Sequence, residues 1–189
     1  MAWWGYLIIA IVVIALVFVI WAISVYNTLI KMKNNVDEAF STMDVYMKKR
    51  YDLIPNLVET VKGYAKHESE TLEKVISARN LAVNSTTPEE QIKNEKNLTS
   101  ALKTLFNVVV ERYPDLKANQ NFIDLQNSLK SIESEIASSR KYYNGTVKVY
   151  NVKREVFPSN IIASMFKFEK RTLYEITNEE QRETVKVQF

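Results

Sequence analysis

The sequence is poor in the residues that build turns, disulfides and most catalytic sites. It has no cysteine, one histidine, three glycines and four prolines among 189 residues. Without cysteine the chain can form no disulfide, no thiolate nucleophile and no sulfur-ligated metal site. Sheets need tight turns, and tight turns use glycine and proline, so the scarcity of both predicts an all-α protein.

The single histidine also limits the chemistry that the chain can carry. A zinc-protease motif HExxH would need a second histidine at the position of Thr71. The Glu-x-x-His pairs that hold metals in helical bundles are missing, and three scattered glycines cannot form a phosphate-binding loop. We therefore expect no metal, no cofactor and no small-molecule substrate. The enzymatic alternative is a hydrolase that uses serine or lysine, with His67 as its base.

Charge of one sign is not in large excess. The chain has 25 Lys and Arg against 22 Asp and Glu, a formal net charge of +3. The basic residues form no stripe interleaved with aromatic side chains, which is the pattern that follows phosphates along a nucleic acid. We therefore expect no nucleic-acid partner.

The most prominent feature that is present is an uncharged run from Trp3 to Val25. A helix of this length spans roughly 35 Å, which exceeds a hydrocarbon core of about 30 Å. The alternative is a cleavable signal peptide: Ala22-Ile23-Ser24 fits a cleavage site, but no basic region precedes the run. We predict a single membrane-spanning helix. Five aromatic residues are expected to anchor its ends at the headgroups, namely Trp3, Trp4, Tyr6, Trp21 and Tyr26.

The lysines indicate the orientation of this helix. No Lys or Arg precedes it, whereas Lys31 and Lys33 follow closely. The positive-inside rule then places the N-terminus outside and the C-terminal domain in the cytoplasm. We expect three parts: an N-terminal tail and anchor (1–26), a helical bundle (27–176) and a flexible C-terminal tail (177–189), in which 185–189 alternate like a short strand.

The remainder of the sequence predicts a long antiparallel bundle of about four helices. Apolar residues recur in steps of four and three from residue 34 to 83, the seam typical of bundles and coiled coils. Pro55 is expected to kink this helix or to start a new one, with Asp52 as its cap. No loop-like stretch separates Tyr26 from Asn34, so the membrane helix should continue directly into the bundle.

Three further helices are expected after residue 87. The first begins with Thr87-Pro88 and ends near Arg112, and the second runs from about Phe122 to Phe157-Pro158. The last follows Ser159 and carries apolar residues as far as Tyr174, on more than one face. It either fills the centre of the bundle or presents an exposed patch to a membrane surface or a partner.

Several stretches of this sequence closely resemble the signature of the bacterial LemA family. They are residues 49–65 (KRYDLIPNLVETVKGYA) with His67-Glu68 and Ala78-Arg79, residues 113–119 (YPDLKAN) with Phe122, Arg140 with Tyr142-Tyr143-Asn144, Tyr150-Asn151, and residues 157–160 (FPSN). One departure is Lys141, where a smaller or amide residue is expected. The resemblance implies a short N-terminal tail, one membrane helix and a long antiparallel helical bundle. It implies no established enzymatic activity.

The signature residues allow two interpretations. Arg50, Asn56 and Glu59 could face Arg140 and Asn144 in a buried polar layer that fixes the helix register. Alternatively, the signature forms a docking face whose tyrosines, Tyr51, Tyr64, Tyr142 and Tyr143, act as anchors. The candidate residues are Arg50, Tyr51, Asp52, Pro55, Asn56, Glu59, Tyr113, Pro114, Asp115, Arg140, Tyr143, Asn144, Asn151 and Pro158.

These features together favour a protein that holds others in place. Our first hypothesis is a non-enzymatic, membrane-anchored scaffold that self-associates into a homo-oligomer at the bacterial cell membrane. The alternative is an adaptor that presents the bundle to a membrane protease, a transporter or an envelope-stress system. The expected partners are therefore the lipid bilayer, further copies of the chain and possible membrane proteins.

Overall fold

The structure is a computed structural model that describes residues 3–65 and 67–174. These residues form six helices and no strand. The all-α fold predicted from the scarcity of turn residues is therefore confirmed. The helices are α1 (Trp3–Lys62), α2 (Ser69–Val83), α3 (Pro88–Arg112), α4 (Pro114–Lys117), α5 (Gln120–Glu155) and α6 (Ser159–Met165).

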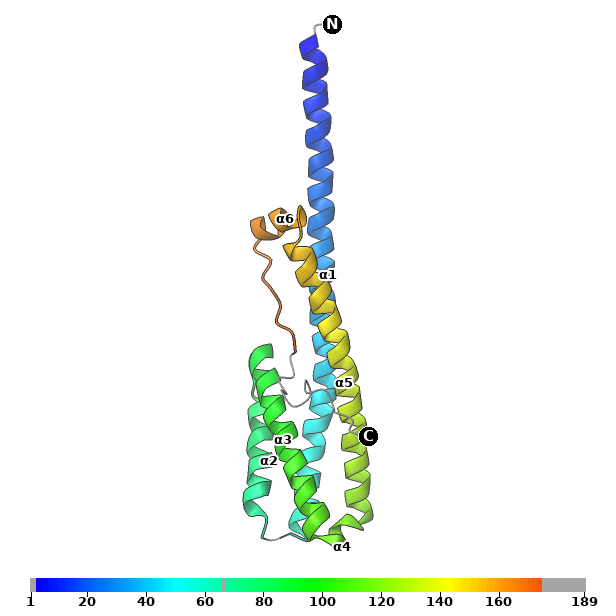
Figure 1. The fold of residues 1–189 in the computed structure, drawn as a ribbon, viewed down its shortest axis with the longest axis vertical. Coiled ribbons are helices and arrows are strands. Elements are labelled where there is room, and N and C mark those ends of the chain that lie inside the picture. Colours follow the sequence, from blue (N-terminus) through cyan, green and yellow to red (C-terminus); the bar gives the residue numbers. More distant parts are fainter. Residues whose placement is uncertain (1–2, 66, 175–189) are drawn as a thin grey trace, which may run out of the picture.

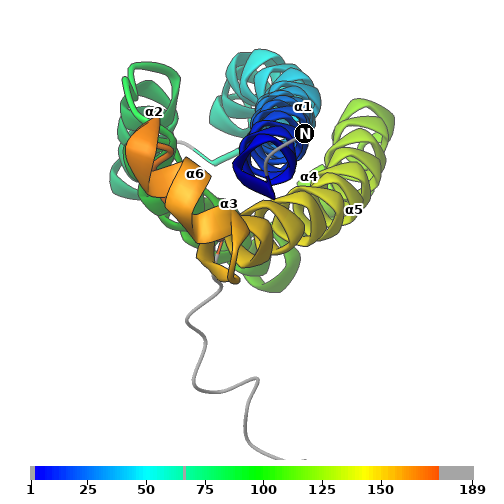
Figure 2. The ribbon, with the colours of Figure 1, turned by 90° about the horizontal axis from the view of Figure 1, so that it is seen from above.

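The helices form a narrow rod in which the N-terminal part of α1 projects alone beyond the bundle (Figure 1). α1 and α5 pack along each other in opposite directions, and α2 and α3 form a second antiparallel pair. α6 lies across the end of the bundle from which the free part of α1 emerges, as the view along the rod shows (Figure 2). Four long helices thus form the antiparallel bundle.

The core follows the heptad-like seam of α1. Its buried side chains include Val36, Met43, Met47, Ile54 and Val61, which are separated by four or by seven residues. This spacing keeps one side of a helix in continuous contact with its neighbours. The core layers facing this seam come from α2, α3 and α5, where the larger apolar members are Leu72, Val75, Leu98, Leu105, Phe122, Leu129, Ile136 and Val147.

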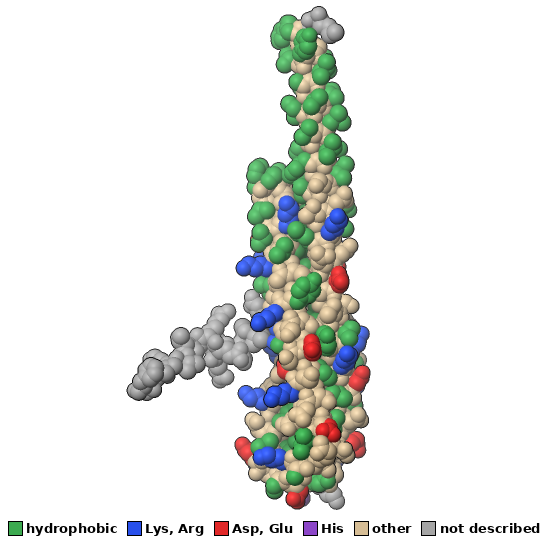
Figure 3. All heavy atoms as spheres, turned by 90° about the vertical axis from the view of Figure 1, so that its right-hand side faces the viewer, with side chains coloured by type: hydrophobic (Ala, Val, Ile, Leu, Met, Phe, Trp, Pro, Cys, Tyr) green, Lys and Arg blue, Asp and Glu red, His purple; other side chains and the backbone are tan. Residues whose placement is uncertain are grey.

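The free part of α1, residues 3–24, is here called the shaft. Its apolar side chains are exposed almost throughout (Figure 3). Among the described residues α1 is the one helix long and apolar enough to cross a membrane. The helix continues without a break from the shaft into the bundle. This confirms the prediction that no loop separates the two.

Pro55 starts no new helix, so that alternative is wrong: α1 continues through it to Lys62. The proline lies on an exposed face within α1, and Asp52 is an exposed residue inside the same helix. The Tyr51 carbonyl, which would normally accept the N–H of residue 55, accepts Arg79 Nε at 3.1 Å. The chain reverses later, after Lys62, where Tyr64 and Ala65 both donate backbone bonds to the Val61 carbonyl.

The last predicted helix is also much shorter than expected. α6 ends at Met165 in a Schellman motif, in which Phe168 N donates to Ala163 O at 2.9 Å and Lys167 N donates to Ser164 O at 3.2 Å. Lys167 adopts φ 53° at the position where glycine is usual. Residues 168–174, here called the strap, then run back along the bundle in an extended conformation. The expected tail 177–189 lies outside the described residues.

Candidate functional site

The strap is held by a row of polar side chains on α5, here called the ladder. Tyr143 Oη donates to Thr172 O, and Tyr150 Oη donates to Glu169 O, both at 2.8 Å. Arg154 Nε donates to Phe168 O at 2.7 Å. An extended segment at the edge of a helical bundle has no neighbouring strand to satisfy its backbone, so side chains must do so. The ladder consists of Tyr143, Asn144, Tyr150, Asn151 and Arg154.

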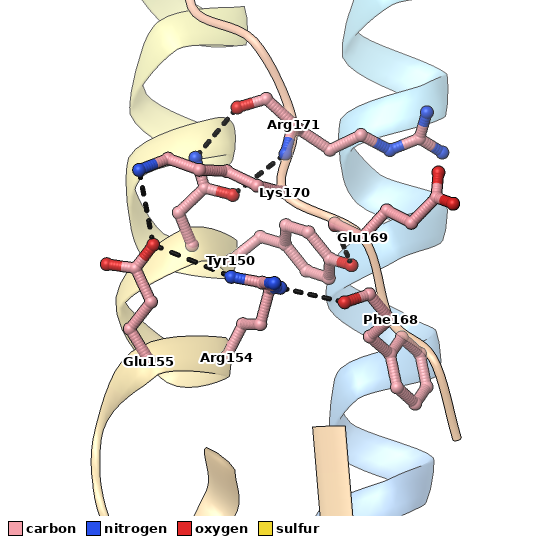
Figure 4. A network of polar contacts seen from close by, with 8 residues as sticks. Tyr150, Arg154, Glu155, Phe168, Glu169, Lys170 and Arg171 are labelled. Carbon is pink, nitrogen blue, oxygen red and sulfur yellow. Dashed lines mark hydrogen bonds and ion pairs between the residues drawn. The ribbon is translucent and has the colours of Figure 1, made fainter. Parts of the chain in front are cut away.

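Two asparagines of the ladder bind the strap backbone through both ends of their amide groups. Asn151 Nδ2 donates to Arg171 O at 2.8 Å, and Arg171 N donates to Asn151 Oδ1 at 3.0 Å. The two dashed lines that end on the backbone of the labelled Arg171 in Figure 4 mark these bonds. Asn144 makes the same pair of bonds with Tyr174, at 3.0 and 2.8 Å. A carboxamide is suited to this because it offers one acceptor and two donors. Each asparagine therefore reproduces the pairing that a neighbouring strand would supply.

The spacing of the ladder matches the spacing of the strap. Asn144 and Asn151 are seven residues apart on α5, and their partners Tyr174 and Arg171 are three residues apart on the strap. Seven helical residues rise about 10.5 Å, and three extended residues cover about 10 Å. The tyrosine pair Tyr143 and Tyr150 repeats the same relationship. One heptad of α5 thus registers with three residues of an antiparallel extended chain.

The strap also connects α5 to the other helices. Arg171 Nη2 lies 2.9 Å from Asp37 Oδ1 of α1. Thr172 Oγ1 donates to Glu89 Oε1 of α3 at 3.0 Å. The guanidinium of Arg140 lies over the ring of Tyr174, 4.3 Å from its centroid, in a cation–π contact. The strap therefore joins three helices.

Burial perturbs the phenols around the strap. It raises the pKa of Tyr143, Tyr150 and Tyr174 above the usual value of 10.0, because the phenolate would lose its hydration. Tyr51, buried on α1, has its pKa raised for the same principal reason. The phenols therefore stay protonated at physiological pH, and those of Tyr143 and Tyr150 donate to strap carbonyls, which suits a structural role better than proton transfer.

A second polar cluster lies inside the bundle around Arg50. Its guanidinium is ion-paired with Glu95 of α3 and contacts Glu133 Oε2 of α5 at 2.6 Å and Thr99 Oγ1 of α3 at 3.1 Å. Arg50 and Glu95 are fully buried, whereas Glu133 reaches solvent. A buried pair of this kind adds little net stability, because the desolvation of both ions offsets their attraction. The cluster ties α1 to both α3 and α5.

This arrangement corrects the predicted polar layer. Arg50 is buried in a polar cluster as expected, but its partners are Glu95, Glu133 and Thr99. Asn56 and Glu59 are exposed, and Glu59 pairs with Lys62 at 3.1 Å. They do not belong to a buried layer, because they lie on the solvent side of α1. The expected neighbours Arg140 and Asn144 instead hold Tyr174 of the strap.

The predicted tyrosine anchors separate into two groups. Tyr51 and Tyr143 are buried and belong to the core, so they cannot serve as a docking face in this fold. Tyr64 and Tyr142 are exposed. Tyr64 Oη accepts a bond from Asn119 Nδ2 at 3.0 Å. Tyr142 thus remains a candidate for an anchor of a docking surface.

The remaining signature residues shape the two ends of the bundle. Tyr113 ends α3 and donates its hydroxyl proton to Glu68 at 3.1 Å, which joins α3 to the start of α2. Pro114 occupies the first turn of α4, and Asp115 is exposed in that turn. Pro158 directly precedes α6 at the opposite end.

The aromatic residues at the two ends of the shaft differ in their surroundings. Trp3, Trp4 and Tyr6 are exposed, as residues at a distal membrane face would be. Trp21 is half-buried against the core. Tyr26 packs on Phe166 and Phe168, with ring centroids 4.7 and 5.8 Å away.

Sequence reasoning missed the ladder, although a signal for it exists. The dipeptide Tyr-Asn occurs at Tyr143-Asn144 and again at Tyr150-Asn151, one heptad later. A repeat of polar residues at helical spacing on one face indicates a partner with regular backbone. Glu95, Glu133 and Arg154 were missed too, because single charged residues on a helix give no such signal.

The described residues hold no cluster of three or more His, Asp or Glu able to bind a metal ion. His67 lies exposed in the turn between α1 and α2, and in the described part of the chain no serine or carboxylate hydrogen-bonds to it. The ladder can bind extended backbone, and the Arg50 cluster can fix helix register. Neither arrangement contains an activated nucleophile.

Two surface grooves flank α5. A groove of about 420 Å³, here called the outer groove, lies between α1 and α5. A second groove of about 410 Å³, here called the α3–α5 cleft, has an apolar floor that includes Leu102, Phe106 and Leu129 and a charged rim that includes Lys103 and Lys130. The outer groove is lined by Met32, Asn35, Lys141, Tyr142, Gly145, Thr146 and Val149.

Comparison with known proteins identifies relatives of this chain. The LemA family matches residues 39–189. Protein LemA of Metamycoplasma hominis is 28% identical over 141 residues, which cover 72% of this chain and 63% of that protein. Magnetosome proteins MamQ 1 and MamQ 2 of Paramagnetospirillum magneticum are each 22% identical over 175 residues, covering 79% of this chain and 64% of theirs. The chain thus spans somewhat less than two thirds of the length of these relatives.

Proposed function

Because the chain belongs to the LemA family, we propose that it is a non-enzymatic, membrane-anchored helical scaffold that self-associates at the bacterial cell membrane. The shaft supports the anchor, since its apolar side chains have no protein cover. Lys31 and Lys33 follow the shaft and favour a cytoplasmic bundle by the positive-inside rule. The continuity of α1 supports a rigid connection, because one helix serves both the membrane and the core.

The main observation in favour of self-association is the environment of Gly145. A glycine in the middle of a helix costs about 1 kcal/mol relative to alanine. Within the protomer nothing requires it, since a Cβ at this position would meet no atom within 4 Å. Gly145 lines the outer groove. A small residue at an exposed groove permits close approach of a second helix, so the outer groove is our proposed contact between copies.

The side chains around Gly145 are suitable for such a contact. Tyr142 and Val149 are more than half exposed on the same groove, and a tyrosine supplies a large contact area with one polar end. Copies anchored in one membrane with one orientation would meet at high effective concentration. Weak lateral contacts are then sufficient for assembly.

The test is the mass of the full chain in detergent and in lipid nanodiscs, measured by light scattering at micromolar concentration. We expect a species larger than one protomer. The chain has no native cysteine, so Val149→Cys provides a single crosslinking site in the outer groove. Oxidation should give a covalent dimer in the membrane, whereas the exposed control Thr104→Cys on α3 should not. A strictly monomeric particle without Val149→Cys crosslinks would refute self-association through this groove.

A second candidate is an adaptor function, favoured by the α3–α5 cleft. Its apolar floor reaches solvent between two charged residues, Lys103 and Lys130. Such a cleft fits an amphipathic helix of a foreign membrane protein, in the way that a groove accepts the apolar face of a helix. A photo-crosslinker at Lys103 in living cells should then capture one dominant foreign protein. Capture of further copies of this chain alone would favour the scaffold.

A further inference from the structure

The end of the bundle nearest the shaft carries an exposed apolar surface, here called the cap patch. Phe157 is 80% exposed and Met165 is 67% exposed, the highest values among the large apolar residues that the structure describes outside the shaft. Val156, Ile161 and Phe166 complete the patch. Contiguous exposed apolar surface of this kind marks a binding surface for protein or membrane. The prediction that the last helix fills the centre of the bundle is therefore wrong for α6.

The cap patch is held in place by the fold. Ser159 Oγ donates to Lys153 O at 2.6 Å and lies 3.0 Å from Val156 O, at the turn that leads into α6. Ile162 and Ala163 point into the core from the opposite side of α6. The Schellman motif fixes the end of the helix. The apolar side chains are thus exposed because the surrounding contacts hold them outward.

The position of the patch indicates its partner. Phe166 packs on Tyr26, which directly follows the end of the apolar run of α1. The patch therefore lies level with the point where the shaft leaves the bundle. On the face seen in Figure 3, hydrophobic side chains gather on the shaft and on the end of the bundle next to it. The apolar surface of the shaft continues onto α6. Any bilayer that surrounds the shaft would meet the patch at its interface.

Charge supports the same conclusion. Basic residues lie close below the shaft: Lys31 and Lys33 on α1, Lys167 after α6, and Lys153 near the end of α5. The one acidic residue at this end of α5, Glu155, is paired with Arg154 and Lys170. Lys31 lies five residues, or about 7.5 Å of helix rise, beyond Tyr26. This offset matches the depth of a headgroup layer, because about 5–7 Å of polar region covers each side of the hydrocarbon core. Lysines at this depth attract anionic lipids.

We propose that the cap patch lies in the membrane interface, with its side chains at the boundary of headgroups and acyl chains and the lysines among anionic headgroups. This inference rests on the proposed anchoring by the shaft but not on its orientation, because the patch faces whichever leaflet borders the bundle. A single helix leaves the bundle free to rotate about its axis and to tilt. A second, lateral attachment fixes both. The outer groove would then be presented in a defined direction along the membrane surface.

The experiment uses the full chain in vesicles of phosphatidylcholine and phosphatidylglycerol. The absence of native cysteine allows single environment-sensitive fluorophores to be attached at Met165→Cys, or at Ile161→Cys if the first variant does not fold. Two reference sites are Ile14→Cys within the shaft and Ser138→Cys on an exposed part of α5. Lipids with a quencher near the top of the acyl chain report shallow insertion, and lipids with a quencher near the chain end report deep insertion.

We expect the label at residue 165 to be quenched several-fold more by the shallow quencher than the label at residue 138, with a blue-shifted emission. The label at residue 14 should respond most to the deep quencher. Replacement of Lys153 and Lys167 by glutamate should reduce the quenching at residue 165 in these vesicles, and unchanged quenching would overturn the role of anionic lipid.

The results that overturn the proposal are distinct from those that overturn the anchor. If residue 14 is quenched and residue 165 remains in water, the shaft spans the membrane and the cap patch does not touch it. A blue-shifted but unquenched label at residue 165 means that protein covers the patch, as in a contact between two copies. If residue 14 is not quenched either, the anchor and the interfacial cap both fail.

Discussion

Arg79 supplies the hydrogen bond that Pro55 removes from α1. Proline has no backbone N–H, so the carbonyl four residues earlier, that of Tyr51, has no helical donor. Arg79 Nε of α2 donates to this carbonyl at 3.1 Å. The proline thus becomes a point at which α2 is bonded to α1, and this explains how a 60-residue helix continues past it.

Arg79→Ala should lower the free energy of unfolding by about 1.5 kcal/mol, the usual value for a bond involving a charged donor. Pro55→Ala restores the backbone N–H that bonds the Tyr51 carbonyl. In a chain that carries Pro55→Ala, Arg79→Ala should therefore cost about 1 kcal/mol less than it does in the parent chain. Urea unfolding of the four proteins in detergent, followed by circular dichroism, gives this double-mutant cycle. Additive effects of the two substitutions would show that the bond does not compensate for the proline.

For the buried Arg50–Glu95 pair, we expect one substitution to destabilise the fold more than the removal of both charges. Arg50→Met leaves the buried carboxylate of Glu95 without its partner, so we expect a loss of about 3–5 kcal/mol. The double substitution Arg50→Met with Glu95→Leu removes both buried charges and should recover most of that loss. Lys74→Met breaks an exposed pair with Glu70 and should leave the urea midpoint unchanged. A double variant as unstable as the single one would refute this account.

The asparagines of the ladder should control attachment of the strap. Asn151→Asp keeps the acceptor for Arg171 N but loses the donor to Arg171 O and repels that carbonyl. We therefore expect the strap to detach more often, with faster hydrogen exchange at the Arg171 amide and at the Tyr174 amide, which is bonded to Asn144. Asn151→Ala should act similarly. Asn127→Ala, on an exposed part of α5, is the control. Unchanged exchange in both Asn151 variants would mean that the strap is held without its amide pairs.

The buried phenols predict a loss of stability at alkaline pH. Burial raises the pKa of Tyr143 and Tyr150 in the folded chain above the 10.0 expected when unfolded. The unfolded state therefore releases these protons first, so stability is complete below pH about 10 and falls as the pH rises further. Urea midpoints across this range should fall less steeply for the variant with Tyr143→Phe and Tyr150→Phe. Exposed Tyr142→Phe is the control, and an equal slope in all three proteins would contradict the prediction.

The long helices could be predicted because apolar spacing and helix caps are read from residues close together in the sequence. The seam from Val36 to Val61 repeats at helical spacing, and Thr87 caps α3 by accepting a bond from Glu90 N, as its sequence indicates. The reversal after Lys62 was missed, since Val61, Tyr64 and Leu72 continue the same apolar spacing across the turn. Periodicity alone does not distinguish a continuous helix from two helices joined by a turn in register.

The strap could not be predicted from local sequence. Its residues are as compatible with a helix as those of α6, and Lys167 stands where a glycine would have indicated the end of the helix. The extended conformation is stabilised by bonds to Asn144 and Asn151, which lie 30 and 20 residues before their partners Tyr174 and Arg171. Tertiary contacts of this kind override a weak local preference. The Tyr-Asn dipeptides of α5 indicate that a partner segment exists but do not identify it.

Substitutions at Gly145 should affect the stability of the protomer and the assembly of copies in different ways. Gly145→Ala adds a Cβ that meets no atom of its own chain, so it should stabilise the folded protomer by about 1 kcal/mol through helix propensity. Gly145→Leu should be tolerated by the protomer but should block close approach at the outer groove and reduce the mass in nanodiscs to that of one copy. Thr104→Leu on exposed α3 is the matched control and should leave the mass unchanged. If Gly145→Leu assembles as the parent chain does, the copies do not meet at this groove.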